Sequence, residues 1–113
     1  MRIEQYDFGL IVIDGKRYTS DVIIYPDRVD FRWWREEGHL LHIDDLKEVL
    51  TEKPETVVVG TGQSGLMQVP SEVKDHFETK GIELIVDKTK NACDIYNKLS
   101  ELKKVIAVLH LTC

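Results

Sequence analysis

The sequence predicts an α/β domain in which an antiparallel meander precedes a partly parallel sheet with helices. Three features support this prediction: an Asp14-Gly15 hairpin signal, a short β-branched run at 56–59, and a helical spacing of apolar residues after position 44. The chain has 113 residues, of which 42% are hydrophobic and 31% are charged. Since one core typically organises about 100–150 residues, we expect a single domain over residues 1–113.

The first third of the chain predicts three antiparallel strands. Residues 10–13 are apolar and lead into Asp14-Gly15, which supplies the positive φ angles that a tight turn requires. Residues 18–25 alternate in polarity and form the second predicted strand. A break at Pro26 separates them from a third strand at 28–35.

The rest of the chain predicts helices that alternate with strands. Asp44 is expected to cap the first helix, and Pro54 follows its end. The second helix opens at Pro70 and Gly81 terminates it, while Thr89 is expected to cap the third. The expected order is therefore β-β-β-α-β-α-β-α-β, with strands at 56–59, 82–86 and 105–111 that form two right-handed crossovers.

Short motifs spread along the chain carry a family resemblance. They are Phe8-Gly9, Ile13-Asp14-Gly15, Tyr18, Pro26, Val58-Val59-Gly60-Thr61-Gly62, Pro70, Gly81-Ile82, Thr89, Ala92-Cys93, Tyr96-Asn97, Leu99, Val105, Ala107 and Leu109. Together they resemble the domain of unknown function 498 family, which includes the eukaryotic adipogenesis-associated protein and a mitochondrial complex I assembly factor. The resemblance implies the Mth938-like fold, a three-layer β/β/α domain, and no established reaction. Because those eukaryotic relatives act through protein contacts, it also implies a binding or assembly role.

A glycine-rich turn is the first candidate site. Residues 60–65 match G-x-G-x-x-G directly after a predicted strand, a spacing found in dinucleotide-binding loops. In such loops the helix begins within the glycines, whereas here Pro70 marks the helix start. Tight exit from the sheet explains the glycines, and capture of a small anion by the loop amides is the functional alternative. The candidate ligand-binding residues are Gly60, Thr61, Gly62, Gln63, Ser64 and Gly65.

A cluster of tryptophan and arginine is the second candidate site. On a strand, Trp33 and Trp34 must face opposite sides, so one is expected in the core and the other, Trp34, at the surface. Trp and Arg are enriched at binding hot spots. We therefore expect a partner-binding patch or homo-oligomer contact at Arg32, Trp34 and Arg35, with packing between two sheets as the alternative.

Other functional classes find little support in the sequence. A net charge of −5 argues against nucleic-acid binding, and no apolar run approaches the length of a membrane span. His39 and His42 are too few for a metal site, and Ser64 lacks the context of a nucleophile elbow. Cys93 is expected to be packed in the core. The sequence thus predicts no catalytic residue, metal or cofactor.

The sequence favours a non-catalytic protein-binding or assembly module of the cytoplasm, with an unidentified protein partner. The alternative is a small-molecule or phosphate-binding protein that uses the turn from Gly60 to Gly65.

Overall fold

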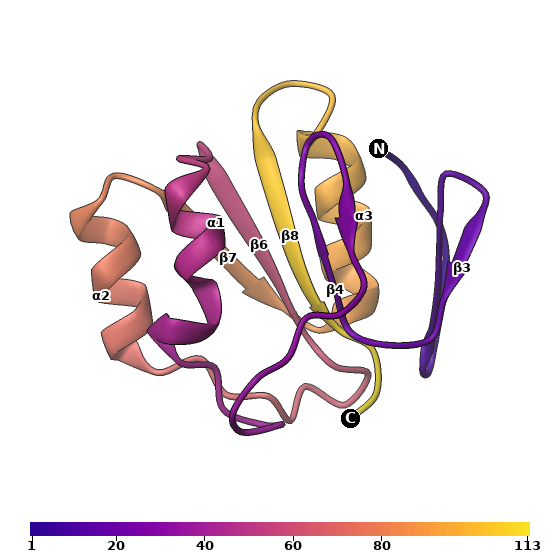
Figure 1. The fold of residues 1–113 in the computed structure, drawn as a ribbon, viewed down its shortest axis with the longest axis horizontal. Helices are drawn as coiled ribbons and strands as arrows, with labels where there is room; N and C mark the ends of the chain where they lie inside the picture. Colours follow the sequence, from indigo (N-terminus) through magenta and orange to yellow (C-terminus); the bar gives the residue numbers. More distant parts are fainter.

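The computed structural model describes residues 1–113, which form two sheets and four helices (Figure 1). The small sheet has the order β1-β2-β3, and the large sheet has the order β5-β4-β8-β6-β7. The strands are β1 (Ile3–Asp7), β2 (Leu10–Ile13), β3 (Lys16–Tyr18), β4 (Val22–Ile24), β5 (Val29–Asp30), β6 (Thr56–Thr61), β7 (Glu83–Asp87) and β8 (Val105–His110). The helices are the 3-10 helix η1 (Ile43–Leu46), α1 (Lys47–Thr51), α2 (Ser71–Thr79) and α3 (Thr89–Leu99). No helix is both long enough and apolar enough to cross a membrane.

Strand β8 lies at the centre of the large sheet. It pairs parallel with β6 on one side and antiparallel with β4 on the other. Every residue of β6 and β8 is buried, because both faces of the sheet are covered. Successive side chains of a strand point to opposite faces, so β8 contributes Ala107 and Leu109 to one core and Ile106 and Val108 to the other.

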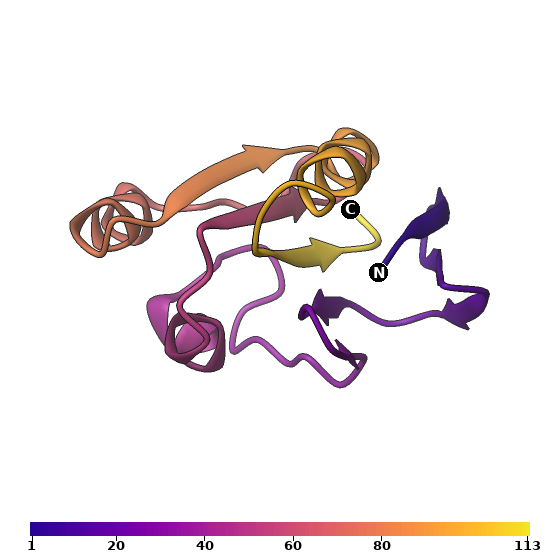
Figure 2. The ribbon, with the colours of Figure 1, turned by 90° about the horizontal axis from the view of Figure 1, so that it is seen from above.

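The two cores define three layers. The helices α1 and α2 cover one face of the large sheet, and α3 together with the small sheet covers the other (Figure 2). On the α3 side, Tyr96 packs with Ile11 of the small sheet. On the opposite side, Phe77 of α2 packs with Val49 of α1. The predicted α/β class, with an antiparallel sheet, a partly parallel sheet and helices, is confirmed.

The predicted strands at 18–25 and 28–35 are wrong in their bounds. The chain leaves the small sheet after Tyr18 and enters the large sheet at Val22, so the meander consists of β1, β2 and β3. All residues of β4 are buried, which marks a strand with both faces covered rather than an alternating one. Strand β5 is only two residues long, and at its end the Asp30 carboxylate accepts the Arg32 N–H.

The helix termini agree with the sequence in part. Helix α2 ends as predicted at Gly81, where φ is +72° and the N–H of Ile82 donates to the Phe77 carbonyl. The first helix begins differently, since the His42 N–H donates to the Asp45 carboxylate and Asp44 is exposed. Thr89 is the first residue of α3 rather than its cap.

The side chain of Asn97 ties α3 to the edge of the small sheet. Its amide oxygen accepts the Ile3 N–H at 2.8 Å, and its amide nitrogen donates to the Ile3 carbonyl at 2.7 Å. Both backbone groups of an edge-strand residue are thereby satisfied by one side chain. The small sheet is thus joined to the helix by polar contacts as well as by the core.

We expect Asn97→Ala to lower the free energy of unfolding by about 2 kcal/mol, because it leaves two partly buried backbone groups without a partner. Chemical denaturation measures the change. Asn91→Ala is the control, since the Asn91 amide makes only one solvent-exposed bond, to the Asp87 carboxylate, and we expect a change within about 0.5 kcal/mol. Equal losses in both variants would contradict the assigned role of Asn97.

Candidate functional site

The glycines of the turn at 60–65 permit close packing at the carboxyl end of β6. A Cβ atom on Gly60 would lie 2.8 Å from the Thr89 Oγ1 atom, and one on Gly62 would lie 2.2 Å from the Cys113 carbonyl carbon. Gly62 also has a φ of +104°, which other residues rarely adopt. Steric contact and backbone angle thus account for both glycines without a ligand.

Most amide groups of this turn are bonded within the protein, and the exposed Ser64 is the exception. The Gly62 N–H donates to the Thr89 hydroxyl at 2.8 Å, and the Gln63 N–H donates to the Thr112 carbonyl at 2.7 Å. Beyond Ser64, the Gly65 N–H donates to the Gly62 carbonyl and the Leu66 N–H donates to the Cys113 carbonyl. An anion-binding nest requires several unpaired N–H groups that converge. The structure instead places these groups in contacts with α3 and with residues that follow β8.

The Thr89 hydroxyl connects three elements at this edge. It donates to the His110 carbonyl at 2.6 Å while it accepts the Gly62 N–H. The sequence predicted a helix cap at Thr89, and this is wrong because the hydroxyl bonds Gly62, directly after β6, and His110 of β8 instead of the α3 amides. Thr61 adds a similar contact, since its hydroxyl donates to the Asp87 carbonyl at 3.1 Å. Gln63 and Ser64 remain exposed at the tip of the turn.

A buried ionic cluster beside the turn is the feature that the sequence did not reveal. The Asp21 Oδ2 atom lies 2.7 Å from the Arg35 guanidinium and 2.8 Å from the His110 Nδ1 atom. The other oxygen of Asp21 accepts the Leu111 N–H at 2.8 Å. The Arg35 guanidinium also donates to the Gly38 carbonyl, and its side chain is only 5% exposed. The Arg35 side chain therefore lies inside the protein and is not part of an exposed patch.

The electrostatics of the cluster favour an ionised Asp21. Burial alone would raise the pKa of this carboxyl, but hydrogen bonds from His110, the Leu111 N–H and Arg35 outweigh it and lower the pKa to about 2. The His110 Nε2 atom is buried and has no hydrogen-bond partner in the protein. The contacts of Asp21 with His110 and Arg35 thus fix the loop that carries Arg35.

The two tryptophans have different environments. Trp33 is half-buried, its ring nitrogen donates to the Asp45 carbonyl, and the Arg35 guanidinium lies 4.7 Å from its ring centre. Trp34 is 76% exposed. Arg32 is exposed beside it, with its guanidinium 5.6 Å from the centre of the Phe31 ring. The exposed part of the predicted patch thus consists of Arg32 and Trp34.

The remaining candidates for chemistry have structural partners. The His42 imidazole lies 2.7 Å from the Glu37 carboxylate, which raises the pKa of His42. The His39 ring packs edge-on against His110 at 5.7 Å, whereas His42 bonds Glu37. The imidazoles of His39 and His42 thus have different partners. Burial, with a smaller contribution from Asp94, raises the pKa of Cys93 to about 12, which leaves its thiol protonated and unreactive.

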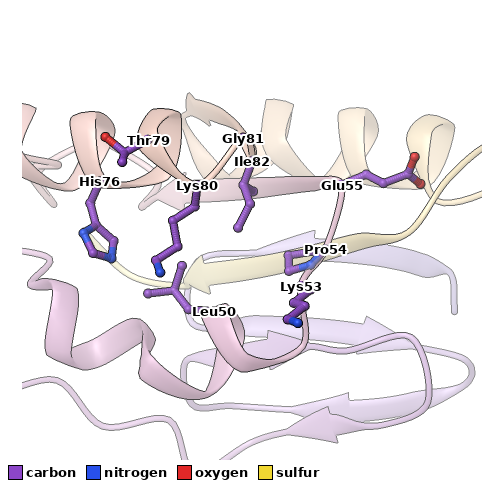
Figure 3. A pocket seen from close by; sticks show the side chains of 9 residues that line it. All are labelled: Leu50, Lys53, Pro54, Glu55, His76, Thr79, Lys80, Gly81 and Ile82. Atoms are coloured by element: carbon purple, nitrogen blue, oxygen red, sulfur yellow. The ribbon is translucent and has the colours of Figure 1, made fainter.

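A cavity of about 640 Å³ opens at the other end of the large sheet, where β6 and β7 begin, between α1, α2 and the start of β7 (Figure 3). His76 and Lys80 point from α2 toward Leu50 of α1, and Lys53 lies on the segment between α1 and β6. No sequence motif marked this cavity, because its lining comes from two helix ends and two loops. The lining residues are Leu50, Lys53, Pro54, Glu55, His76, Thr79, Lys80, Gly81 and Ile82.

Comparison with known proteins identifies the family of this chain. The family model described as "Protein of unknown function (DUF498/DUF598)" matches residues 3–110. The chain belongs to this family. It is 32% identical to the conserved hypothetical protein PH1505 from Pyrococcus horikoshii, with full coverage of both chains and a TM-score of 0.85.

Two further structures support the same fold. The protein MT938 is 28% identical over 99% of this chain and 98% of its own, with a TM-score of 0.81. A Bordetella pertussis protein described as a Mth938-like domain is 18% identical over 97% of this chain and 85% of its own, with a TM-score of 0.64. The Mth938-like fold implied by the sequence motifs is therefore confirmed, and the DUF498 family is one of unknown function.

We expect Thr89→Val to lower the free energy of unfolding by about 2–4 kcal/mol. The shape of the side chain is nearly kept, but the Gly62 N–H and the His110 carbonyl lose a buried partner. Thermal and chemical denaturation measure the effect. Thr51→Val is the matched control, because the Thr51 hydroxyl bonds a carbonyl on an exposed helix face. We expect this variant to change the free energy of unfolding only slightly. Similar stabilities of the two variants would show that the hydroxyl of Thr89 does not hold this edge.

We expect the stability of the DUF498 chain to fall as the pH is lowered from about 4 to about 2. The folded-state pKa of Asp21 lies near 2, below its ordinary value of 3.8, so its contribution is complete above 3.8 and is lost as Asp21 is protonated. The loss should be on the order of 1–2 kcal/mol after allowance for partial exposure. Asp21→Asn should remove this component of the pH profile and lower stability at neutral pH, since Arg35 would then be buried without a counter-charge. An unchanged acid profile in Asp21→Asn would refute the assignment.

Proposed function

We propose that this DUF498 chain is a non-catalytic protein-binding or assembly module that contacts its partner through the loops at the carboxyl ends of β6 and β8. The observation that carries the proposal is the 76% exposure of Trp34, next to the exposed guanidinium of Arg32. A tryptophan gains more from burial at an interface than most side chains, and Trp and Arg dominate binding hot spots.

The backbone that carries Trp34 is held firmly in place. On one side, Trp33 packs against the core and donates its ring N–H to Asp45. On the other side, Arg35 is anchored by Asp21 and by the Gly38 carbonyl. Two neighbouring anchors thus leave Trp34 exposed on a fixed segment, which reduces the entropy lost when a partner binds.

Three more exposed aromatic or aliphatic side chains belong to segments at this end of the sheet. Phe8 precedes Gly9, whose N–H donates to the Leu111 carbonyl directly after β8. Leu66 donates its own N–H to Cys113, and the Phe31 carbonyl accepts the Ser20 hydroxyl just before β4. Their exposed fractions are 54% for Phe8, 51% for Leu66 and 47% for Phe31. Such a concentration of large apolar side chains at one edge supports an interaction surface.

The chemistry of this edge favours a protein partner with an apolar segment and a carboxylate. Trp34 offers the apolar contact, and Arg32 has a guanidinium with no acidic partner within the chain to pair with that carboxylate. A second copy of the chain is one such partner. The net charge of −5 argues against nucleic acid, and we place the module in the cytoplasm. Ligand binding by the turn at 60–65 is less well supported, because the Gly62, Gln63 and Gly65 amides bond protein oxygens.

We expect Trp34→Ala to weaken partner binding or self-association at least 30-fold while the free energy of unfolding changes by less than about 0.5 kcal/mol. The wild type and Trp34→Ala serve as the two baits for affinity capture from native extract. Mass determination in solution measures self-association, and titration with the captured partner measures its affinity. Leu102→Ala is the matched control, because Leu102 is 80% exposed but lies in the loop between α3 and β8, at the other end of the sheet. Equal binding by wild type and Trp34→Ala, or a large loss of stability in Trp34→Ala, would refute the proposal.

A further inference from the structure

The open cavity between α1 and α2 has the volume of a small-molecule site. Its volume of about 640 Å³ falls within the 300–1,000 Å³ that ligand pockets usually occupy. Leu50 forms its floor on the α1 side, and Ile82 forms an apolar wall at the start of β7 (Figure 3). The opening lies at the amino ends of β6 and β7, whereas the surface that carries Trp34 lies at the carboxyl ends of β6 and β8.

The charged side chains of the cavity are predominantly basic, although the chain as a whole is acidic. Lys53 and Lys80 line it, and neither forms an ion pair within the protein. The only carboxylate of the lining, Glu55, points away from the cavity and accepts the Lys104 N–H at 2.8 Å (Figure 3). His76 adds a ring nitrogen donor that also points inward.

The helix ends at the cavity do not cancel this positive charge. Helices α1 and α2 both terminate here, and each C-terminus carries at most about half a negative elementary charge. Their final carbonyls already accept N–H groups, namely those of Glu52, Lys53, Gly81 and Ile82. The two lysine side chains thus outweigh the partial charges of the helix ends, and the Glu55 carboxylate is directed away from the opening.

The backbone conformation of Lys53 is unusual for a lysine. Both helices that end at the cavity are followed by a residue with positive φ, which is +72° at Gly81 and +50° at Lys53. Glycine adopts such an angle without steric cost, whereas lysine is strained there. The residue at this strained position is thus a lysine whose side chain lines the cavity. Backbone strain of this kind is often found at functional sites.

We propose that the cavity binds a small organic anion, with its phosphate or carboxylate held by Lys53 and Lys80 and its apolar body packed against Leu50 and Ile82. The His76 ring donates an additional hydrogen bond to the anionic group. The mixture of two ammonium groups with an apolar wall selects against neutral compounds, which cannot use the charges, and against inorganic anions, which cannot use the wall.

Phenyl phosphate and phenylacetate are the probes for this site, with benzyl alcohol and inorganic phosphate as comparison compounds. Titration calorimetry on the full chain should give a dissociation constant at or below about 1 mM for at least one organic anion, and at least about tenfold weaker binding for the comparison compounds. Amide chemical-shift changes should concentrate at Lys53, Gly81 and Ile82. The preferred probe distinguishes a phosphate ligand from a carboxylate ligand.

Lys53→Gly separates binding from stability. It removes a charge and relieves the strained φ, so the melting temperature should stay the same or rise while binding weakens at least about fivefold. Lys80→Gln should weaken binding similarly, and Lys98→Gln, in the last turn of α3, should not. Absence of binding by both organic anions up to about 10 mM, equal binding of benzyl alcohol, or unchanged affinity in Lys53→Gly and Lys80→Gln would overturn the proposal.

Discussion

Burial of β8 on both faces is the constraint on which the rest of the structure depends. A strand in that position must place successive side chains in two different cores, and it must have a strand on each side to satisfy its backbone groups. The pairing with β6 requires the crossover through α3, and the pairing with β4 draws residues 22–24 away from the small sheet. The small sheet and α3 then cover the face that holds Ala107 and Leu109, and α1 and α2 cover the face that holds Ile106 and Val108.

The polar cluster at the end of β8 follows from the same constraint. Where this buried strand ends, the His110 carbonyl and the Leu111 N–H need partners that lie away from water. Thr89 supplies the donor for the first and Asp21 the acceptor for the second. Asp21 is itself satisfied by Arg35, which fixes the loop next to Trp34. The exposed surface that we propose for binding is thus rigid because the strand behind it is buried.

The parts that the sequence predicted are those governed by local or periodic signals. The β-branched run of β6, the Asp14-Gly15 turn and the end of α2 at Gly81 each depend on a few neighbouring residues, and each was placed well. The errors concern residues whose partners are distant in sequence. Asp21 and His110 are 89 positions apart, and Thr89 and Gly62 are 27 apart, so neither contact leaves a local pattern. Arg35 looked like a surface residue for the same reason.

Residue type and backbone conformation together are more informative here than sequence motifs. The turn at 60–65 matches a well-known spacing, yet the backbone explains its glycines, because Gly60 and Gly62 leave no room for a side chain. At Lys53 the relation is reversed, since the backbone favours glycine and the sequence has lysine. Packing accounts for a glycine where only glycine fits. A hairpin turn accounts for the positive φ of Asp14, whereas Lys53 lies in no such turn, and the cavity that its side chain lines offers a reason for a charged residue there.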